Sequence, residues 1–373
     1  MSIILYNRVL LHLSERVATL QEGKMTEIIN RLLIPDIDLD ERSPENYPYT
    51  AEVQFENGVC LKGMAVWHFN RKRDWQFPVL RDTLAVTVGS VGSTEKWVGL
   101  SEGPIPQVDP SGTIEATLDT GGESGVLAWH MGKMGHAMES WDSKSLVAAE
   151  LAILIDGFDA LPDSFRRMWS SKEELGEWYA YLVWERAKTS HLLRLQKYEK
   201  DADIGDPEVY ILDRLMEKFD AIRLFDDYGI DASKERRLQI HDEVCGDPRL
   251  EPALPFDTRV AHMMEYTPED YYQLHYVPLN VSRDDYYGSG TSYSRIQLLG
   301  SFSGDIRNIR FADAINDHVQ NRENVFAIGG GGHIARTVPI LHERSNIQIQ
   351  KIEWHIGEAA CIAAISEVRP SHH

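Results

Sequence analysis

The sequence predicts an α/β or α+β protein whose mixed sheet carries a C-terminal βαβ layer and a helical insertion. Residues 49–130 contain stretches that alternate between polar and apolar side chains, which is typical of strands. Residues 142–245 follow a helical period instead. The last part of the chain, about 80 residues, passes from helix to strand, loop, helix and strand, and this order implies parallel strands joined by crossover helices.

Length and composition are those of a globular protein with several regions. The chain has 373 residues, 43% of them hydrophobic and 26% charged, so it can bury a core without disulfide or metal staples. We divide it into an N-terminal helix and linker, a β-rich region, a helical region, and a loop-rich segment that leads into the C-terminal α/β layer. The boundaries are residues 1–48, 49–141, 142–245 and 246–373.

In the first part of the chain we expect one helix followed by mostly antiparallel strands. Residues 2–33 are amphipathic, and the acidic segment 35–48, with three prolines, is interpreted as a linker. The Asn-Gly pair at 57–58 signals a hairpin between two strands. A further strand is expected over 83–93, and two more around the Gly-Gly pair at 121–122.

The middle of the chain is expected to be helical. One helix is predicted over 143–158, and Ser171 with Glu174 has the spacing of a capping box before the next. An Asp-Pro pair at 206–207 is typical of the start of a third helix. Residues 246–290 are rich in Pro, Tyr and Asp without a clear period, so we expect loops there.

The C-terminal elements follow one another closely. A helical face repeats through 309–319, and the apolar run 325–328 is typical of a buried strand. Four glycines and His333 come next, and Thr337 is expected to cap a helix that ends at Arg344. A strand over 346–352 and a small-residue helix over 357–366 complete the layer.

Charge and cysteine content narrow the classes of partner and compartment. The net charge of −20 argues against a broad nucleic-acid surface and against an anionic membrane surface. The N-terminus lacks the pattern of a signal peptide, and no apolar run is long enough for a membrane span. Three widely spaced cysteines, an odd number, indicate a reducing compartment. We therefore expect a cytoplasmic protein with a small-molecule substrate or ligand, and leave a homo-oligomer open.

The glycine run with its histidine is the strongest local signal for chemistry. A buried strand delivers these residues to the carboxyl edge of a sheet, where open α/β folds bind ligands. The backbone N–H groups of Gly330, Gly331 and Gly332 can approach an anion closely. His333 can serve as acid, base or metal ligand, and Arg336 adds a cation for substrate charge. The alternative is a tight strand-to-helix turn whose histidine caps a backbone carbonyl.

Two further residues follow a strand expected to run parallel to the first. His355 is a candidate second metal ligand beside His333, and Glu358 is the candidate general base. The alternative for Glu358 is a helix start, where a carboxylate is favoured by the helix dipole.

The segment that runs from Arg307-Asn308 to the glycine run and His333 resembles the closing segment of TraB/GumN (Tiki-like) proteins and their erythromycin-esterase/ChaN-like relatives. In that group an Arg-Asn pair begins a helix and the next strand ends in a Gly-x-Gly-His loop. The resemblance spans about 50 residues. It implies a polar hydrolytic site at the strand ends, open to metal assistance, with Arg307 catalytic and Asn308 ligand-binding. The early Gly-x-x-His of the group has no counterpart here.

Two other resemblances compete for the same tail. The Gly-Gly-Gly-His stretch is similar to a loop of archaeal-type D-aminoacyl-tRNA deacylases, and residues 356–366 resemble the last helix of FAD-dependent oxidoreductases. We do not expect FAD, because the N-terminal dinucleotide fingerprint is absent. The leading hypothesis is a hydrolase, with a divalent metal left open. The alternatives are a non-enzymatic small-molecule or nucleotide-binding regulatory module and an acidic interaction or assembly protein.

Overall fold

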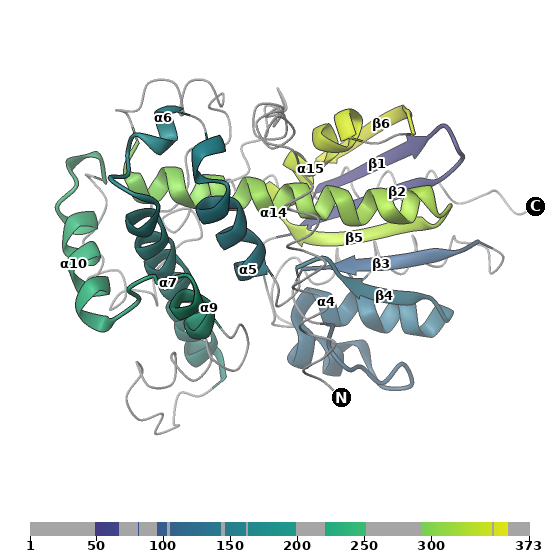
Figure 1. Ribbon diagram of the computed structural model, residues 1–373. Coiled ribbons are helices and arrows are strands. Elements are labelled where there is room, and N and C mark those ends of the chain that lie inside the picture. The colour runs from purple at the N-terminus through teal and green to yellow at the C-terminus, as the bar shows by residue number, and fades with distance from the viewer. Residues whose placement is uncertain are drawn as a thin grey trace, which may run out of the picture. The chain divides into compact units, whose positions relative to one another are not determined.

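The computed structural model describes residues 49–66, 81, 95–102, 105–142, 146–161, 163–198, 221–250, 293–344 and 347–356 (Figure 1). They fall into two compact units. The sheet unit holds the described residues within Leu33–Ser143 and Gly304–His373, and the helical unit holds those within Lys144–Ser303. The helical unit is therefore inserted into the sequence of the sheet unit, and the expected α/β fold with a helical insertion is confirmed.

The sheet unit is built on a six-stranded sheet in the order β4-β3-β5-β2-β1-β6. Strand β1 pairs antiparallel with both β2 and β6, whereas the pairs β2–β5, β3–β5 and β3–β4 are parallel. Five strands thus share one direction, and their carboxyl ends lie at one edge. The strands are β1 (Tyr49–Phe55), β2 (Cys60–Val66), β3 (Trp97–Ser101), β4 (Ala137–Ser140), β5 (Asn324–Gly330) and β6 (Ile349–Ile356).

The hairpin predicted at residues 57–58 is confirmed. Strands β1 and β2 pair with Val53 opposite Leu61, and Phe55 N donates to Val59 O at 2.9 Å across the turn. Gly58 has φ +83°, a conformation that glycine adopts without strain. The side-chain oxygen of Asn57 accepts from Val59 N at 3.1 Å, which closes the turn.

The two strands expected around residues 121–122 are wrong, because this stretch is helix α4 (Ile114–Met134). Thr113 caps it by accepting a hydrogen bond from Ala116 N at 3.3 Å. The helix is kinked at Gly122, whose φ of 55° and ψ of −144° are non-helical. Strand β4 pairs parallel with β3, and a parallel pair needs a long crossover rather than a tight turn. Tertiary pairing thus overrides the local strand preference of Thr, Ile and Val.

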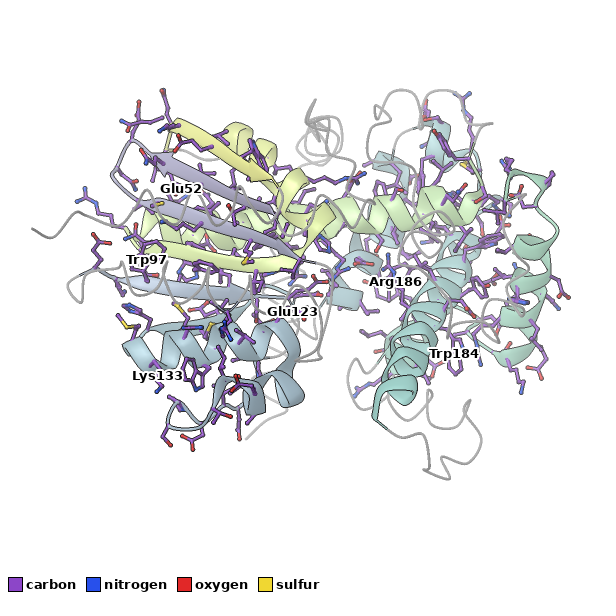
Figure 2. The ribbon with its side chains drawn as sticks, turned by 180° about the vertical axis from the view of Figure 1, so that it is seen from behind. Glu52, Trp97, Glu123, Lys133, Trp184 and Arg186 are labelled. Atoms are coloured by element: carbon purple, nitrogen blue, oxygen red, sulfur yellow. The ribbon has the colours of Figure 1, made fainter. Side chains whose placement is uncertain are left out.

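Helices cover both faces of the sheet. Met64 of β2 packs with residues of α4, whereas a Cβ on the adjacent Gly63 would lie 3.2 Å from Ile334 of α15 (Gly331–Arg344). Since successive strand residues face opposite sides, α4 and α15 cover opposite faces. Helix α14 (Arg295–Gln320) crosses in front of β5 and β2 in Figure 1 and behind the strands in Figure 2. The helical face predicted through 309–319 is confirmed.

Strand β5 passes directly into α15. Gly329 and Gly330 end the strand and Gly331 and Gly332 begin the helix, so the expected glycine-rich loop is a strand-to-helix junction. The expected helix start at Thr337 is also wrong, since α15 already includes two earlier turns. Ile334 is 2% exposed, and its burial against the sheet stabilises this first part of the helix.

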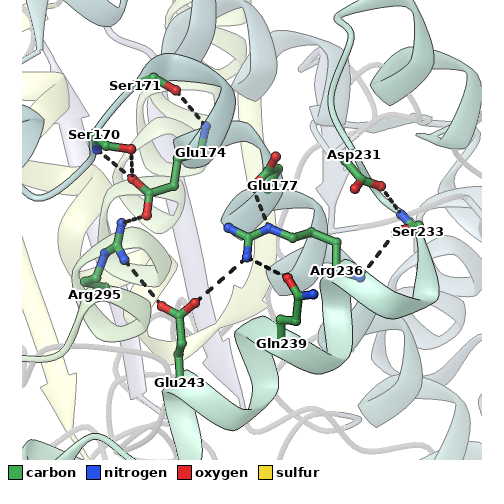
Figure 3. A network of polar contacts seen from close by, with 10 residues as sticks. All are labelled: Ser170, Ser171, Glu174, Glu177, Asp231, Ser233, Arg236, Gln239, Glu243 and Arg295. Carbon is green, nitrogen blue, oxygen red and sulfur yellow. Dashed lines mark hydrogen bonds and ion pairs between the residues drawn. The ribbon is translucent and has the colours of Figure 1, made fainter.

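The helical unit confirms the predicted helical region in its described part. Ser171 Oγ accepts from Glu174 N at 3.2 Å, while the Glu174 carboxylate accepts from Ser170 N at 2.6 Å (Figure 3). The helix expected over 143–158 is α-helical and then π-helical. The described elements of the helical unit outside α14 are α5 (Leu146–Leu151), a π-helix (Ala152–Asp156), short 3₁₀ segments (Phe158–Ala160, Pro248–Leu250), α6 (Asp163–Arg166), α7 (Lys172–Tyr198), α9 (Ala221–Asp227) and α10 (Lys234–Cys245).

Some expected elements lie outside the described residues. These are the helices over 2–33 and 357–366, the linker 35–48, the strand over 83–93, the helix start at 206–207 and most of the loops over 246–290. Within the ranges that the structure describes, no helix is long and apolar enough to span a bilayer.

Candidate functional site

Polar side chains gather where three neighbouring parallel strands end. Glu102 directly follows β3, Asp142 follows β4 by two positions, and Gly330 is the last residue of β5. Because β3 lies between β4 and β5, these three strand ends are adjacent. Ligands of open α/β folds bind at this edge of the sheet.

An arginine from α14 joins the two carboxylates. Arg307 Nη2 donates to Glu102 Oε1 and to Asp142 Oδ2, each at 2.6 Å. The three side chains are 14–15% exposed, so water screens the ion pairs only in part. Charge-assisted hydrogen bonds of this length rank among the strong ones.

His333, in the first turn of α15, has a polar neighbour at each ring nitrogen. Its Nδ1 lies 2.6 Å from Asn308 Oδ1, and its Nε2 lies 3.6 Å from Glu102 Oε1. An amide oxygen only accepts hydrogen bonds, so the contact with Asn308 assigns the proton to Nδ1 in the neutral ring. Nε2 then carries the lone pair on the side of Glu102. We call Glu102, Asp142, Arg307, Asn308 and His333 the edge cluster.

An aromatic wall and a glycine floor border the edge cluster. Trp141 stacks on Phe311 with ring centroids 4.5 Å apart and meets His333 edge-on at 5.1 Å. A Cβ added to Gly329 would lie 3.7 Å from Glu102 Oε2, 3.9 Å from Trp141 Cζ2 and 4.0 Å from the Cβ of His333. These are ordinary contact distances, so the floor has room for about one methyl group.

The structure brings together three of the residues singled out in the sequence. His333, Arg307 and Asn308 all belong to the edge cluster. Arg307 and Asn308 lie in the middle of α14, whereas the resembling group begins a helix with this pair. The backbone N–H of Gly330 donates to Glu102 Oε2 at 3.3 Å, so this N–H orients a carboxylate.

Gly331 and Gly332 open α15, and the N–H groups of a helix's first turn have no acceptor within the helix. They lie at the same sheet edge as the cluster because they directly follow β5. These two positions form a helix start instead of a loop, and their binding of an anion stays a prediction.

The other predicted site residues lie elsewhere. Arg336 is 7% exposed, and its Nη1 contacts Asp305 Oδ1 at 3.1 Å. His355 is in β6, and β2 and β1 lie between β6 and β5. Three strand spacings put the backbones of β5 and β6 roughly 14 Å apart. The side chain of His355 and the whole of Glu358 lie outside the described residues.

The described part of the chain contains no group of three His, Cys, Asp or Glu side chains placed to hold a metal ion. The guanidinium of Arg307 contacts one oxygen of Glu102 and one oxygen of Asp142.

Two acidic members of the cluster were not predicted from the sequence. The available signal was an acidic residue just after each of two short strands, Glu102 after WVGLS and Asp142 after AMESW. Interpreting residues 113–130 as two strands concealed it, because only the crossover helix α4 makes β3 and β4 parallel neighbours. Comparisons of the chain with models of known protein families, with curated proteins and with solved structures find no match.

Proposed function

We propose that the protein is a hydrolase that acts on a small polar or acyl substrate at the edge cluster, with His333 as its acid–base group. The observation that carries the proposal is the pair of contacts at the His333 ring, with Asn308 at Nδ1 and Glu102 beside Nε2. A base oriented by one neighbour and electrostatically supported by another is the arrangement that general-base catalysis needs.

In the proposed reaction His333 Nε2 accepts a proton from a water molecule while the water oxygen attacks the carbonyl carbon of the substrate. The tetrahedral intermediate carries the negative charge on its former carbonyl oxygen. When the bond to the leaving group breaks, the proton on Nε2 passes to that group. Water has then been added across the bond, and His333 is neutral again.

The neighbours of His333 stabilise the states that this sequence creates. Glu102, 3.6 Å from Nε2, stabilises the imidazolium formed after the first proton transfer. Asn308 keeps Nδ1 as the donor and so keeps the lone pair on Nε2. The N–H groups of the first turn of α15 are suitably placed to stabilise the developing oxyanion. Arg307 anchors Glu102 and Asp142 and thereby sets the position of the carboxylate beside the imidazole.

A panel of para-nitrophenyl esters and amides tests the proposal with the purified full chain. We expect hydrolysis that falls by at least about a hundredfold in His333→Ala and about tenfold in Glu102→Gln. His136→Gln is the matched control, because His136 follows α4 and does not belong to the edge cluster. Equal activity of His333→Ala and the wild type would refute the proposal. Activity that EDTA abolishes and Zn²⁺ or Mn²⁺ restores would replace the acid–base mechanism with a metal-assisted one.

The second candidate is a binding module that uses the same cluster without turnover. It is favoured by the preformed ion pairs of Arg307, which hold the cluster in one arrangement. A ligand that raises the melting temperature of the wild type but not of His333→Ala, with no product formed, would support this function.

A further inference from the structure

The charges of the edge cluster do not match an anionic substrate. Glu102 and Asp142 contribute two negative charges and Arg307 one positive charge, so the cluster carries a net charge of −1 while His333 is neutral. Arg307 contacts both carboxylates, and the other predicted cation, Arg336, contacts Asp305. Both arginines singled out in the sequence thus face carboxylates of the protein itself.

A buried donor at the same place provides a second, independent observation. Trp141 is 4% exposed, and its buried indole Nε1 has no hydrogen-bond partner among the described residues. Nε1 and Cζ2 are both bonded to Cε2, and Cζ2 is the indole atom nearest the space above Gly329. Nε1 is therefore two bonds away from the indole atom nearest that space. A buried N–H donor without an acceptor is costly, and a substrate oxygen would satisfy it.

We propose that the substrate is a small molecule with a protonated amine near its hydrolysable carbonyl group, and this inference rests on the proposed function of the edge cluster. The ammonium group lies against the carboxylates of Glu102 and Asp142, and the carbonyl oxygen accepts from Trp141 Nε1 before attack. The space above Gly329 holds the short chain between the two. The net charge of −20 on the whole chain also raises the local concentration of cations.

Three para-nitrophenyl esters of nearly equal length test the charge preference, those of β-alanine (cationic), butyrate (neutral) and succinate (anionic). We expect kcat/KM for the β-alanine ester to exceed that for the butyrate ester about tenfold, with the succinate ester slowest. Raising the ionic strength from about 0.05 to about 0.5 M should reduce this ratio. A preference for the neutral or anionic ester would overturn the inference.

Two variants test whether the preference for the cationic ester arises at the edge cluster. Asp142→Asn should lower the ratio of the cationic to the neutral ester about tenfold, because it removes one negative charge. Gly329→Ala should raise KM for the β-alanine ester and leave the melting temperature within about 2 °C of the wild type, because the added methyl fills the space without a clash. An unchanged ratio in Asp142→Asn, or an unchanged KM in Gly329→Ala, would place the preference outside the cluster and refute the assignment.

Binding measurements separate the failure of this inference from the failure of the proposed function. If no ester is hydrolysed, thermal stabilisation by β-alaninamide, butyramide and succinamate is compared. Stabilisation by β-alaninamide alone, lost in Asp142→Asn, would support the inference that the cluster binds a cationic ligand and would refute the proposed hydrolase activity. Hydrolysis without a charge preference would sustain the hydrolase and refute the cationic substrate. Stabilisation by none of the three, without hydrolysis, would refute both.

Discussion

Arg307 Nη2 lies 2.6 Å from Glu102 Oε1, although 205 residues separate the two side chains along the chain. The same nitrogen is 2.6 Å from Asp142 Oδ2. One guanidinium thus ties the ends of β3 and β4 to α14. The edge cluster consequently depends on tertiary packing, and we expect the removal of its cation to lower stability as well as the proposed activity.

Arg307→Met should destabilise the protein by roughly 1–3 kcal/mol at neutral pH, because two partly buried carboxylates lose their counter-charge. Urea unfolding measures the change. Adding Asp142→Asn to Arg307→Met should restore part of the lost free energy of unfolding, since it removes one of the two negative charges. A double-mutant cycle with no coupling between positions 142 and 307 would contradict this account.

Asn308→Ala should lower kcat about ten- to a hundredfold with little change in KM, because His333 loses the acceptor that orients its ring. Asn308→Asp keeps an acceptor but adds a negative charge beside Nδ1. Its activity should persist, with the acidic limb of the pH–rate profile moved to higher pH, because the carboxylate stabilises the imidazolium. Identical pH profiles for Asn308→Asp and the wild type would show that Asn308 has no positioning role.

His130 makes stability depend on pH. Burial, and then the charge of Lys133, lower the pKa of His130 from 6.5 to about 4. Between these values the unfolded chain binds a proton that the folded protein does not, so the free energy of unfolding falls as the pH falls through this window. The loss amounts to roughly 3 kcal/mol, given 1.36 kcal/mol per pKa unit.

His130→Gln should flatten the stability profile between about pH 6.5 and pH 4, because glutamine does not titrate there. Melting temperatures across this range measure the effect. His136→Gln provides the comparison. If His130→Gln keeps the wild-type slope, another group is responsible for the pH dependence.

Gly122→Ala should cost roughly 1–3 kcal/mol, because φ 55° with ψ −144° is unfavourable for a residue with a Cβ. Gly329→Ala is the matched control, with the same substitution at a position where the new Cβ makes only ordinary contacts. Urea denaturation of both variants compares the two sites. Equal stability of the two would mean that the kink in α4 relaxes without cost.

Arg295→Lys should destabilise the helical unit by about 1–2 kcal/mol. The guanidinium lies over the rings of Trp169 and Trp178, 4.4 and 4.5 Å from their centroids. Its Nη2 contacts Glu174 at 2.6 Å (Figure 3). An ammonium group reproduces neither the stacking nor the forked geometry. Thermal unfolding followed by tryptophan fluorescence measures the loss. Arg167→Lys, in an exposed ion pair, should change stability by less than about 0.5 kcal/mol.

How much of the site could be predicted depended on the range of the interactions involved. His333 was identified because a glycine run after an apolar stretch is a local signal. Arg307 and Asn308 were singled out by a resemblance in the same 50-residue stretch. Their contacts with Glu102 and His333 were not predicted. Glu102 and Asp142 were not predicted, because their one local signal is a position just after a short strand and each is one acidic residue among the 58 of the chain.

The sequence by itself determined the elements whose side-chain period is unambiguous. The face of α14 through Val319, the buried strand β5 and the turn at Gly58 all follow from spacings within a few residues. Tertiary structure alone decided that residues 114–134 form a helix and that Glu102, Asp142 and His333 meet at one edge. The physical reason is that helical and strand periods are local, whereas the adjacency of parallel strands is set by burial and pairing between segments far apart in the chain.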